Sequence, residues 1–261
     1  MKTSDKKYAT SGTVVENRLL CGNWHRIVVH CPQVASAAKP GQFAQIGAWT
    51  GSDPLIRRPL GIAGVEGETF SLLLQTVGRG TELIASKQPG EKLDIIGPLG
   101  NGFPEESQGK FVWLIAGGTG IAPILFLLSA WKFHETRLYY GARAAADCGA
   151  ISLLPEGAII TTETGDAGRI GLVTEALAAD IADVGREPDF IFACGPMPMM
   201  RQAHKMCQEP EIPCHVSLEA HMGCGFGACL GCAVPGADRP YYHVCAEGPV
   251  FNSEKIGWDK F

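Results

Sequence analysis

The sequence has no run of basic residues and little charge of either sign. Charged residues make up 19 % of the 261 positions, and 22 Lys and Arg stand against 27 Asp and Glu, a net charge of −5. Because nucleic-acid binding depends on lysine and arginine to neutralise phosphates, we expect no nucleic-acid partner. The first twelve residues, MKTSDKKYATSG, contain charges but no apolar stretch. We therefore expect no signal peptide.

Cysteine occurs at ten positions, too sparsely for a disulfide-rich secreted domain of this length. Internal repeats and low-complexity tracts are also lacking. These features favour a cytoplasmic protein whose scattered cysteines are mostly reduced and buried. The scattered cysteines are Cys21, Cys31, Cys148, Cys194, Cys207 and Cys214.

Residues 111–131, FVWLIAGGTGIAPILFLLSAW, carry no charge over a length that could span a bilayer. Three glycines and Pro123 interrupt this stretch, which is typical of a turn and not of a membrane helix. The pattern predicts a buried parallel strand that runs into a buried helix, so we expect no membrane span.

The chain is expected to be a multidomain β + α/β protein. In residues 1–103, short apolar runs separated by Gly and Pro predict an antiparallel β-barrel, with strands at 25–30, 41–47, 69–76 and 91–100 and one short helix at 80–87. In residues 109–208, apolar strands alternate with helices, which predicts a parallel doubly wound domain. Its strands are expected at 111–118, 136–143, 158–165 and 189–196, and its helices at 121–133, 172–181 and 197–208. Residues 209–261 are expected to form a small cysteine-rich C-terminal domain.

Four cysteines in the C-terminal part follow the pattern C-x4-C-x2-C-x12-C: Cys224, Cys229, Cys232 and Cys245. The first three have the plant-type [2Fe–2S] spacing, with the fourth ligand returning later. The intervening residues are small, so the chain can wrap closely around inorganic sulfur. The alternative is a structural zinc site, but zinc sites usually pair two C-x2-C units. The spacing favours the iron–sulfur cluster.

Two glycine-containing turns follow strands of the α/β region, at the edge where such sheets bind ligands. Gly117, Gly118, Thr119 and Gly120 open a helix, where backbone N–H groups can bind a pyrophosphate. The motif is not the Rossmann G-x-G-x-x-G, because Pro123 replaces the third glycine. Cys194, Gly195 and Pro196 form the second turn, in which Cys194 either contacts a nicotinamide or is simply buried.

Two barrel motifs suit a second nucleotide. Arg57 and Arg58 begin RRPLG, which we place at the end of a barrel strand, and a guanidinium is well suited to a diphosphate. The alternative is a pair of solvated arginines. The GRGT motif resembles a second phosphate turn, in which Thr81 can cap the following helix.

These motifs occur in the order of the ferredoxin–NADP reductase superfamily, which the chain resembles over essentially its whole length. The most specific part is 217–251, where SLEAHMGCGFGACLGCAV and VCAEGPVF are similar to the electron-transfer subunit of class B dihydroorotate dehydrogenase. This resemblance implies FAD on the barrel, NAD(H) on the α/β domain and a [2Fe–2S] cluster at the C-terminus. The flavin contacts that it implies are Arg58, Pro59, Leu60, Gly61, Leu73, Leu74, Gln75, Gly80 and Thr81.

One residue departs from the family pattern. Gly61 stands where a serine is usual, so a hydroxyl expected beside the flavin is missing. The choice of NAD over NADP also rests on the resemblance, since Arg143 could meet a 2′-phosphate.

The resemblance implies an oxidoreductase subunit that relays electrons and has no catalytic side chain of its own. Its implied partner is an FMN-containing dihydroorotate dehydrogenase catalytic subunit, in a heterotetramer with two copies of each, acting in pyrimidine biosynthesis. Surface candidates for the partner are Phe226, Leu230, Tyr241 and Tyr242, although local packing explains them equally well. Similar chains serve as flavin subunits of sulfhydrogenases or electron-bifurcating transhydrogenases. A non-catalytic zinc-knuckle regulatory module is the alternative from another class.

Overall fold

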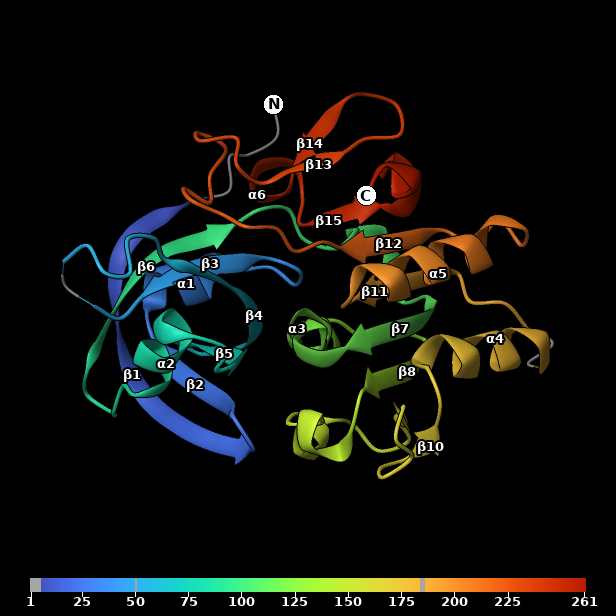
Figure 1. The fold of residues 1–261 in the computed structure, drawn as a ribbon, viewed down its shortest axis with the longest axis horizontal. Coiled ribbons are helices and arrows are strands. Elements are labelled where there is room, and N and C mark those ends of the chain that lie inside the picture. The colour runs from blue at the N-terminus through green and yellow to red at the C-terminus, as the bar shows by residue number, and fades with distance from the viewer. Residues whose placement is uncertain (1–5, 50, 184–185) are drawn as a thin grey trace.

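The computed structural model describes residues 6–49, 51–183 and 186–261. Its first part is a closed antiparallel barrel with the strand order β1-β2-β5-β4-β3-β6, shown in blue and teal in Figure 1. The strands are β1 (Tyr8–Cys21), β2 (Trp24–His30), β3 (Phe43–Gly47), β4 (Arg58–Glu66), β5 (Thr69–Gln75) and β6 (Lys92–Leu99). Two short helices, α1 (Pro32–Ala37) and α2 (Arg79–Ala85), lie between strands. The predicted barrel is confirmed.

Strand β3 illustrates how the barrel faces two environments. Side chains alternate along a strand, so Ala44 and Ile46 enter the barrel core. Phe43 faces outward and joins a hydrophobic core shared with the later parts of the chain. Gln45 also faces outward, yet it has 0 % of its surface exposed. The outer face of β3 is therefore covered by the rest of the chain.

The second part is a seven-stranded sheet with the order β10-β9-β8-β7-β11-β12-β15. All neighbouring pairs are parallel except β12–β15. The strands are β7 (Phe111–Gly117), β8 (Glu135–Ala142), β9 (Ile159–Thr162), β10 (Arg169–Ile170), β11 (Phe190–Cys194), β12 (Cys214–Ser217) and β15 (Val250–Asn252). The helices are α3 (Ile121–Ala130), α4 (Val173–Asp183) and α5 (Met197–Gln208).

The sheet carries helices on both faces, as predicted for a doubly wound domain. Helix α3 lies between the sheet and the barrel strand β4, whereas α4 and α5 cover the opposite face (Figure 1). Every residue of β7 is buried, because a strand in the middle of such a sheet is covered from both sides. The uncharged stretch 111–131 is thus a buried strand followed by a largely buried helix. Within the described ranges, no helix is both long enough and apolar enough to cross a membrane.

The C-terminal segment is not a separate layer. Its strands β12 and β15 complete the sheet, and the chain between them carries the cysteine loop, the hairpin β13 (Ala233–Pro235) and β14 (Tyr241–His243), and α6 (Val244–Glu247). One hydrophobic core joins this segment to α5, to the sheet and to Phe43 and Leu99 of the barrel. Short 3-10 turns complete the chain: η1 (Glu105–Ser107), η2 (Gly118–Gly120), η3 (Ala145–Asp147), η4 (Ile151–Leu153), η5 (Ser253–Lys255) and η6 (Trp258–Lys260).

Candidate functional site

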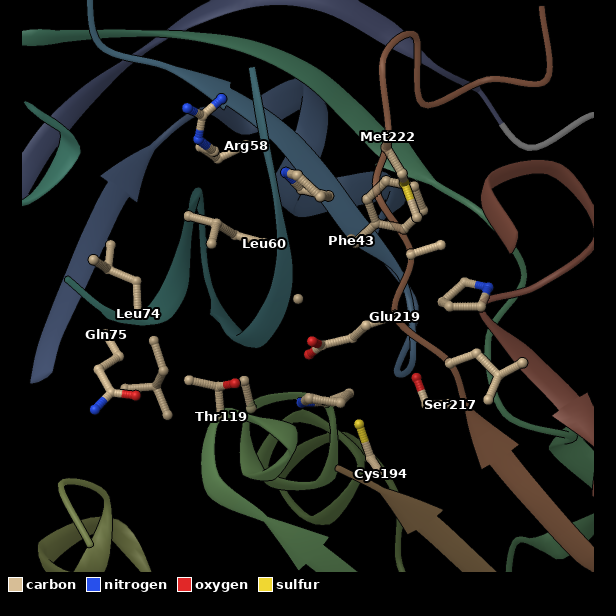
Figure 2. Close-up of a pocket in the computed structure, with 18 of the residues that line it drawn as sticks. Phe43, Arg58, Leu60, Leu74, Gln75, Thr119, Cys194, Ser217, Glu219 and Met222 are labelled. Carbon is tan, nitrogen blue, oxygen red and sulfur yellow. The ribbon is translucent and has the colours of Figure 1, made fainter. Parts of the chain in front are cut away.

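A cavity of about 510 Å³ lies where the barrel, the α/β sheet and the segment after β12 meet. Figure 2 shows side chains from all three parts pointing into it. The barrel supplies the predicted residues Arg58, Pro59, Leu60, Gly61, Leu73, Leu74, Gln75 and Thr81. The α/β part supplies the predicted Thr119 and Cys194, together with Ala122 and Pro123. Residues predicted from motifs far apart in the sequence therefore share one cavity.

Arg58 occupies one end of the cavity. It begins β4, so it does not end a barrel strand as the sequence suggested. Its guanidinium lies over the ring of Trp49, 5.8 Å from the ring centroid, and Nη1 donates to the Ile56 carbonyl at 2.6 Å. A Cβ at Gly80 would overlap this guanidinium, so only glycine permits the approach. The predicted arginine and the predicted glycine turn are thus in contact.

Thr81 stabilises the turn next to Arg58. Its hydroxyl donates to the Gly78 carbonyl at 2.8 Å and accepts the N–H of Val77 at 3.0 Å. The side chain therefore shapes the loop before α2 and still lines the cavity. A fixed cation beside an apolar cavity fits a ligand with a planar ring system and a diphosphate.

Gly61 faces the α/β domain across the cavity. A Cβ there would lie 3.5 Å from Cδ of Pro123, an ordinary van der Waals distance. The Cβ of a serine, the residue that the resemblance leads us to expect here, would therefore fit without a clash. Polar side chains on the facing walls include Thr119, Ser217, Glu219 and His221.

The two glycine turns of the α/β part pack against each other. A Cβ at Gly120 would overlap the Cys194 carbonyl, and one at Gly117 would lie 2.7 Å from Cδ of Pro196. Gly195 in turn approaches the backbone of Gly117. Gly118 differs from these, because it has a φ of +53° and open space where a Cβ would stand. It is the member of the loop that leaves room for a dinucleotide to approach the backbone.

Cys194 lines the cavity as a protonated thiol. It is 2 % exposed, and burial together with the nearby Glu219 carboxylate raises its pKa well above the usual thiol range. A hydrogen bond with Ser217 only partly offsets this effect. Because the thiolate is the nucleophilic form, Cys194 is suited to contact a ligand and not to attack one.

Glu219 is a cavity residue that our sequence analysis did not predict. Its carboxylate points into the middle of the cavity in Figure 2 and is open to solvent there. Protein atoms surround it on other sides, and this desolvation raises the pKa of the carboxyl group. The sequence carried no clear signal for it, because a single carboxylate after the mixed strand Cys214–Ser217 belongs to no motif.

The cysteine loop holds its thiols with backbone N–H groups. Cys224 Sγ accepts hydrogen bonds from the N–H groups of Phe226, Ala228 and Cys229 at 3.3–3.5 Å. Cys245 Sγ accepts the N–H of Gly227 at 3.1 Å and lies 3.2 Å from Cys232 Sγ.

These donors favour the charged form of a thiol. Burial opposes ionisation of Cys224, but the backbone donors outweigh it and lower the pKa of the thiol to about 6. At Cys245 burial and the neighbouring Cys232 prevail and raise the pKa to about 12. A bound cation would counter that repulsion, because metal ligands bind as thiolates. Among the described residues, no group of three His, Cys, Asp or Glu side chains lies close enough together to hold a metal ion by itself. The backbone donors, the spacing of the four cysteines and the small loop residues fit an iron–sulfur cluster.

Three of the four proposed partner-contact residues are exposed near this loop. Phe226, Leu230 and Tyr241 have 48 %, 56 % and 62 % of their surfaces accessible. Tyr242 is buried, its hydroxyl donates to Asp238 at 2.9 Å, and its ring packs on Phe251. Tyr242 is therefore a packing residue.

Comparison with known proteins first establishes the class. Residues 114–205 match the model of the oxidoreductase NAD-binding domain, and residues 219–257 match the iron–sulfur cluster binding domain of dihydroorotate dehydrogenase B. A ferredoxin NADP+ reductase from Neisseria gonorrhoeae, solved with FAD and NADP, has the same fold, with a TM-score of 0.63 at 18 % identity over 77 % of this chain and 90 % of that one. The chain is an oxidoreductase subunit with the ferredoxin–NADP reductase fold and an added cluster-binding segment.

The family follows from closer relatives. The dihydroorotate dehydrogenase B (NAD+) electron transfer subunit of Bacillus caldolyticus is 33 % identical over 94 % of this chain and 96 % of the relative. The same subunit of Desulforamulus reducens is 35 % identical over 92 % of this chain and 95 % of the relative. The chain belongs to the family of dihydroorotate dehydrogenase B (NAD+) electron transfer subunits.

A solved structure is also similar. The structure of the NADH-dependent reduced ferredoxin-NADP oxidoreductase, described for flavin-based electron bifurcation, aligns with a TM-score of 0.83 at 27 % identity. The alignment covers 97 % of this chain and 92 % of that one.

Proposed function

We propose that this subunit passes electrons between NAD(H) and an FMN-containing dihydroorotate dehydrogenase catalytic subunit, through FAD and a [2Fe–2S] cluster. The observation that carries the proposal is the path of one segment. Residues 217–222 line the cavity, and Cys224 follows two positions after Met222. The wall of the proposed flavin site thus continues directly into the proposed cluster loop.

Each cofactor is assigned to residues of the chain. For FAD we propose the barrel residues of the cavity, with Arg58 at the diphosphate, beside Gly80 and Thr81. For NAD(H) we propose the turns formed by Gly117, Gly118, Thr119, Gly120, Cys194, Gly195 and Pro196. For the cluster we propose Cys224, Cys229, Cys232 and Cys245. When bound at these residues, FAD would supply both two-electron chemistry towards NAD(H) and one-electron chemistry towards the cluster.

The side chains position these groups and exclude water. Leu60, Leu73 and Leu74 give the cavity an apolar wall, which suits a planar ring. Gly118 leaves its backbone open to a dinucleotide, and Cys194 and Thr119 lie where the two proposed sites meet. The backbone donors of the cysteine loop stabilise thiolate charge. No side chain needs to form a covalent bond with substrate.

We further propose a heterotetramer with two copies of each subunit and a cytoplasmic location. The cysteines support the location, since none of the ten, all of them within the described ranges, forms a disulfide. We propose that residues 1–103 bind FAD, residues 109–208 bind NAD(H) and residues 209–261 bind the cluster. Strands β12 and β15 of the last part nevertheless pair within the sheet of the second part.

A flavin subunit of an electron-bifurcating enzyme is the second candidate, favoured by the structural similarity at a TM-score of 0.83. The two candidates predict different acceptors. Purified protein should show flavin and iron–sulfur absorption, and a colourless zinc protein would refute both. Co-purification with the catalytic subunit should then yield NAD+-dependent dihydroorotate oxidation. Ferredoxin-dependent reduction of NADP+ without that activity would favour the second candidate.

A further inference from the structure

Gln45 is a buried amide whose polar atoms have no protein partner. Its side chain is fully buried, and both Oε1 and Nε2 are without a hydrogen bond among the described residues. A buried amide is normally paired, because leaving it unpaired forfeits its hydrogen bonds to water. A missing partner at such a position points to a group that the protein chain does not supply.

The amide points at the cysteine loop. A Cβ at Gly225 would lie 2.6 Å from Cγ and 3.0 Å from Nε2 of Gln45. Gly225 is buried, has a φ of +81° and directly follows Cys224. The loop therefore rests on Gln45 through a residue that has no side chain, one position from a proposed ligand.

The neighbouring strands and the flavin cavity offer Gln45 no partner. Its neighbours in register are Pro59 on β4 and Ile96 on β6. Neither has a polar side chain that could pair with the amide. The flavin cavity is lined by Phe43 and Pro59 but not by Gln45. Of the two proposed cofactor sites beside β3, only the cluster loop contacts the amide.

We propose that Gln45 is a positioning residue of the cluster, donating its Nε2–H to a sulfur of the bound [2Fe–2S] group or of its Cys224 ligand. Sulfide and thiolate only accept hydrogen bonds, so the atom that can bond to them is Nε2, the donor of the carboxamide. This inference rests on the proposed assignment of the four cysteines. It adds a donor from the barrel, the flavin-binding part of the chain, to the donors that the loop supplies itself.

The bond should raise the reduction potential of the cluster. Reduction adds negative charge to the sulfurs, and a donor stabilises the more negative state, since hydrogen bonds to the sulfurs set cluster potentials. Replacing Gln45 with methionine keeps the length of the side chain and removes the donor. In Gln45→Met we expect the ratio of reduced to oxidised cluster at a fixed potential to fall about tenfold. For a one-electron couple this corresponds to a midpoint about 59 mV lower.

The measurement is a redox titration of the reconstituted protein followed by electron paramagnetic resonance, with the flavin midpoint read in the same samples. The matched control is Gln42→Met. Gln42 is an equally buried glutamine of the barrel, but Nε2 donates to the Gly100 carbonyl at 2.7 Å and Oε1 accepts the Lys39 N–H at 2.8 Å. Gln42→Met should lower the melting temperature and leave the cluster potential unchanged. Gln45→Met should not lower the melting temperature of the cluster-free protein.

The outcomes separate this inference from the proposed function. Protein without any cluster absorption would refute the ligand assignment itself. An intact cluster with an unchanged midpoint in Gln45→Met, or a shift of the flavin midpoint alone, would overturn the role of Gln45 and leave the relay standing. If the variant does not fold, wild-type protein labelled with ¹⁵N in its glutamine side chains decides the question. Hyperfine coupling of a side-chain ¹⁵N to the reduced cluster supports the bond, and its absence refutes it.

Discussion

The backbone N–H of Gly227 donates a hydrogen bond to Sγ of Cys245, 3.1 Å away, although the two residues are 18 positions apart. This bond ties the loop between the first two cysteines to the last one. Cys232 lies 3.2 Å from the same sulfur. Two of the four sulfurs are therefore already adjacent, and the loop after Cys224 is tied to them through Gly227.

Cys229→Ser should abolish the cluster, because a serine hydroxyl ionises far less readily than a thiol and is a poor ligand for iron. We expect loss of iron–sulfur absorption and of electron transfer to the catalytic subunit, with bound FAD and NADH–dye activity retained. Cys21→Ser, at an exposed cysteine at the end of β1, is the control and should change neither. Full activity of Cys229→Ser with the partner would refute the ligand assignment.

Arg58→Ala should weaken FAD retention. The loss of a charge-assisted hydrogen bond costs about 1.5–3 kcal/mol, so the dissociation constant should rise roughly ten- to hundredfold. Flavin content after gel filtration measures the effect. Arg57→Ala is the matched control, because Nε of Arg57 pairs with Asp94 at 2.8 Å and Arg57 does not line the cavity. Equal flavin content in both variants would count against the proposed contact.

Gly118→Val should raise the KM for NADH roughly tenfold or more without changing bound flavin. A valine side chain would fill the open space at Gly118 and is strained at a φ of +53°. Gly90→Val reports the cost of strain alone. Gly90 also has a positive φ, +92°, and open space where a Cβ would stand, but it does not line the cavity. An unchanged KM in Gly118→Val would remove this loop from the site.

Glu219→Gln should make the cofactor-free protein relatively more stable as the pH rises. Desolvation raises the pKa of Glu219 above 4.5, its ordinary value, so the folded state holds this proton more tightly than the unfolded state. Its contribution to stability is therefore full below pH 4.5 and is lost as the pH rises through the folded pKa. Glutamine has no proton to lose.

Thermal unfolding from pH 4 to pH 8 checks this sign. The melting temperatures of wild type and Glu219→Gln should converge at the acidic end, and the variant should melt higher at the neutral end. Glu156→Gln, at an exposed glutamate in a turn, is the control and should follow wild type throughout. A variant that melts lower than wild type at the neutral end would show instead that the fold stabilises the carboxylate.

Local patterns in the sequence were sufficient to predict the barrel and the alternating part of the sheet. An uncharged run such as β7 can only be buried, and the glycines after it must form a turn. The same reasoning missed β1, a strand of 14 residues, because its pairing with β2 contains register shifts that blur the alternation.

Contacts between distant segments were harder to predict. Nothing in the pattern of 250–252 indicates that β15 pairs antiparallel with β12. The strand pattern of β3 predicts that Gln45 faces outward into solvent. It is buried instead by Gly225, which lies 180 positions later in the chain. Most residues that line the cavity belong to motifs singled out from the sequence, but the shared cavity itself was not predicted. Glu219 was missed because a single carboxylate carries no spacing pattern.

The cysteine loop leaves the sheet after β12 and returns to it at β15, so both of its ends are fixed side by side in one sheet. The loop is therefore anchored to the sheet at both ends and does not hang from one flexible end. An electron carrier on a flexible tether must search for its donor in each turnover, whereas this one is held at a constant separation from the cavity. A truncation at residue 208 would also remove two strands and leave β11 with an open edge, a surface prone to aggregation. Attempts to transplant the loop onto another protein should therefore carry β12 and β15 with it.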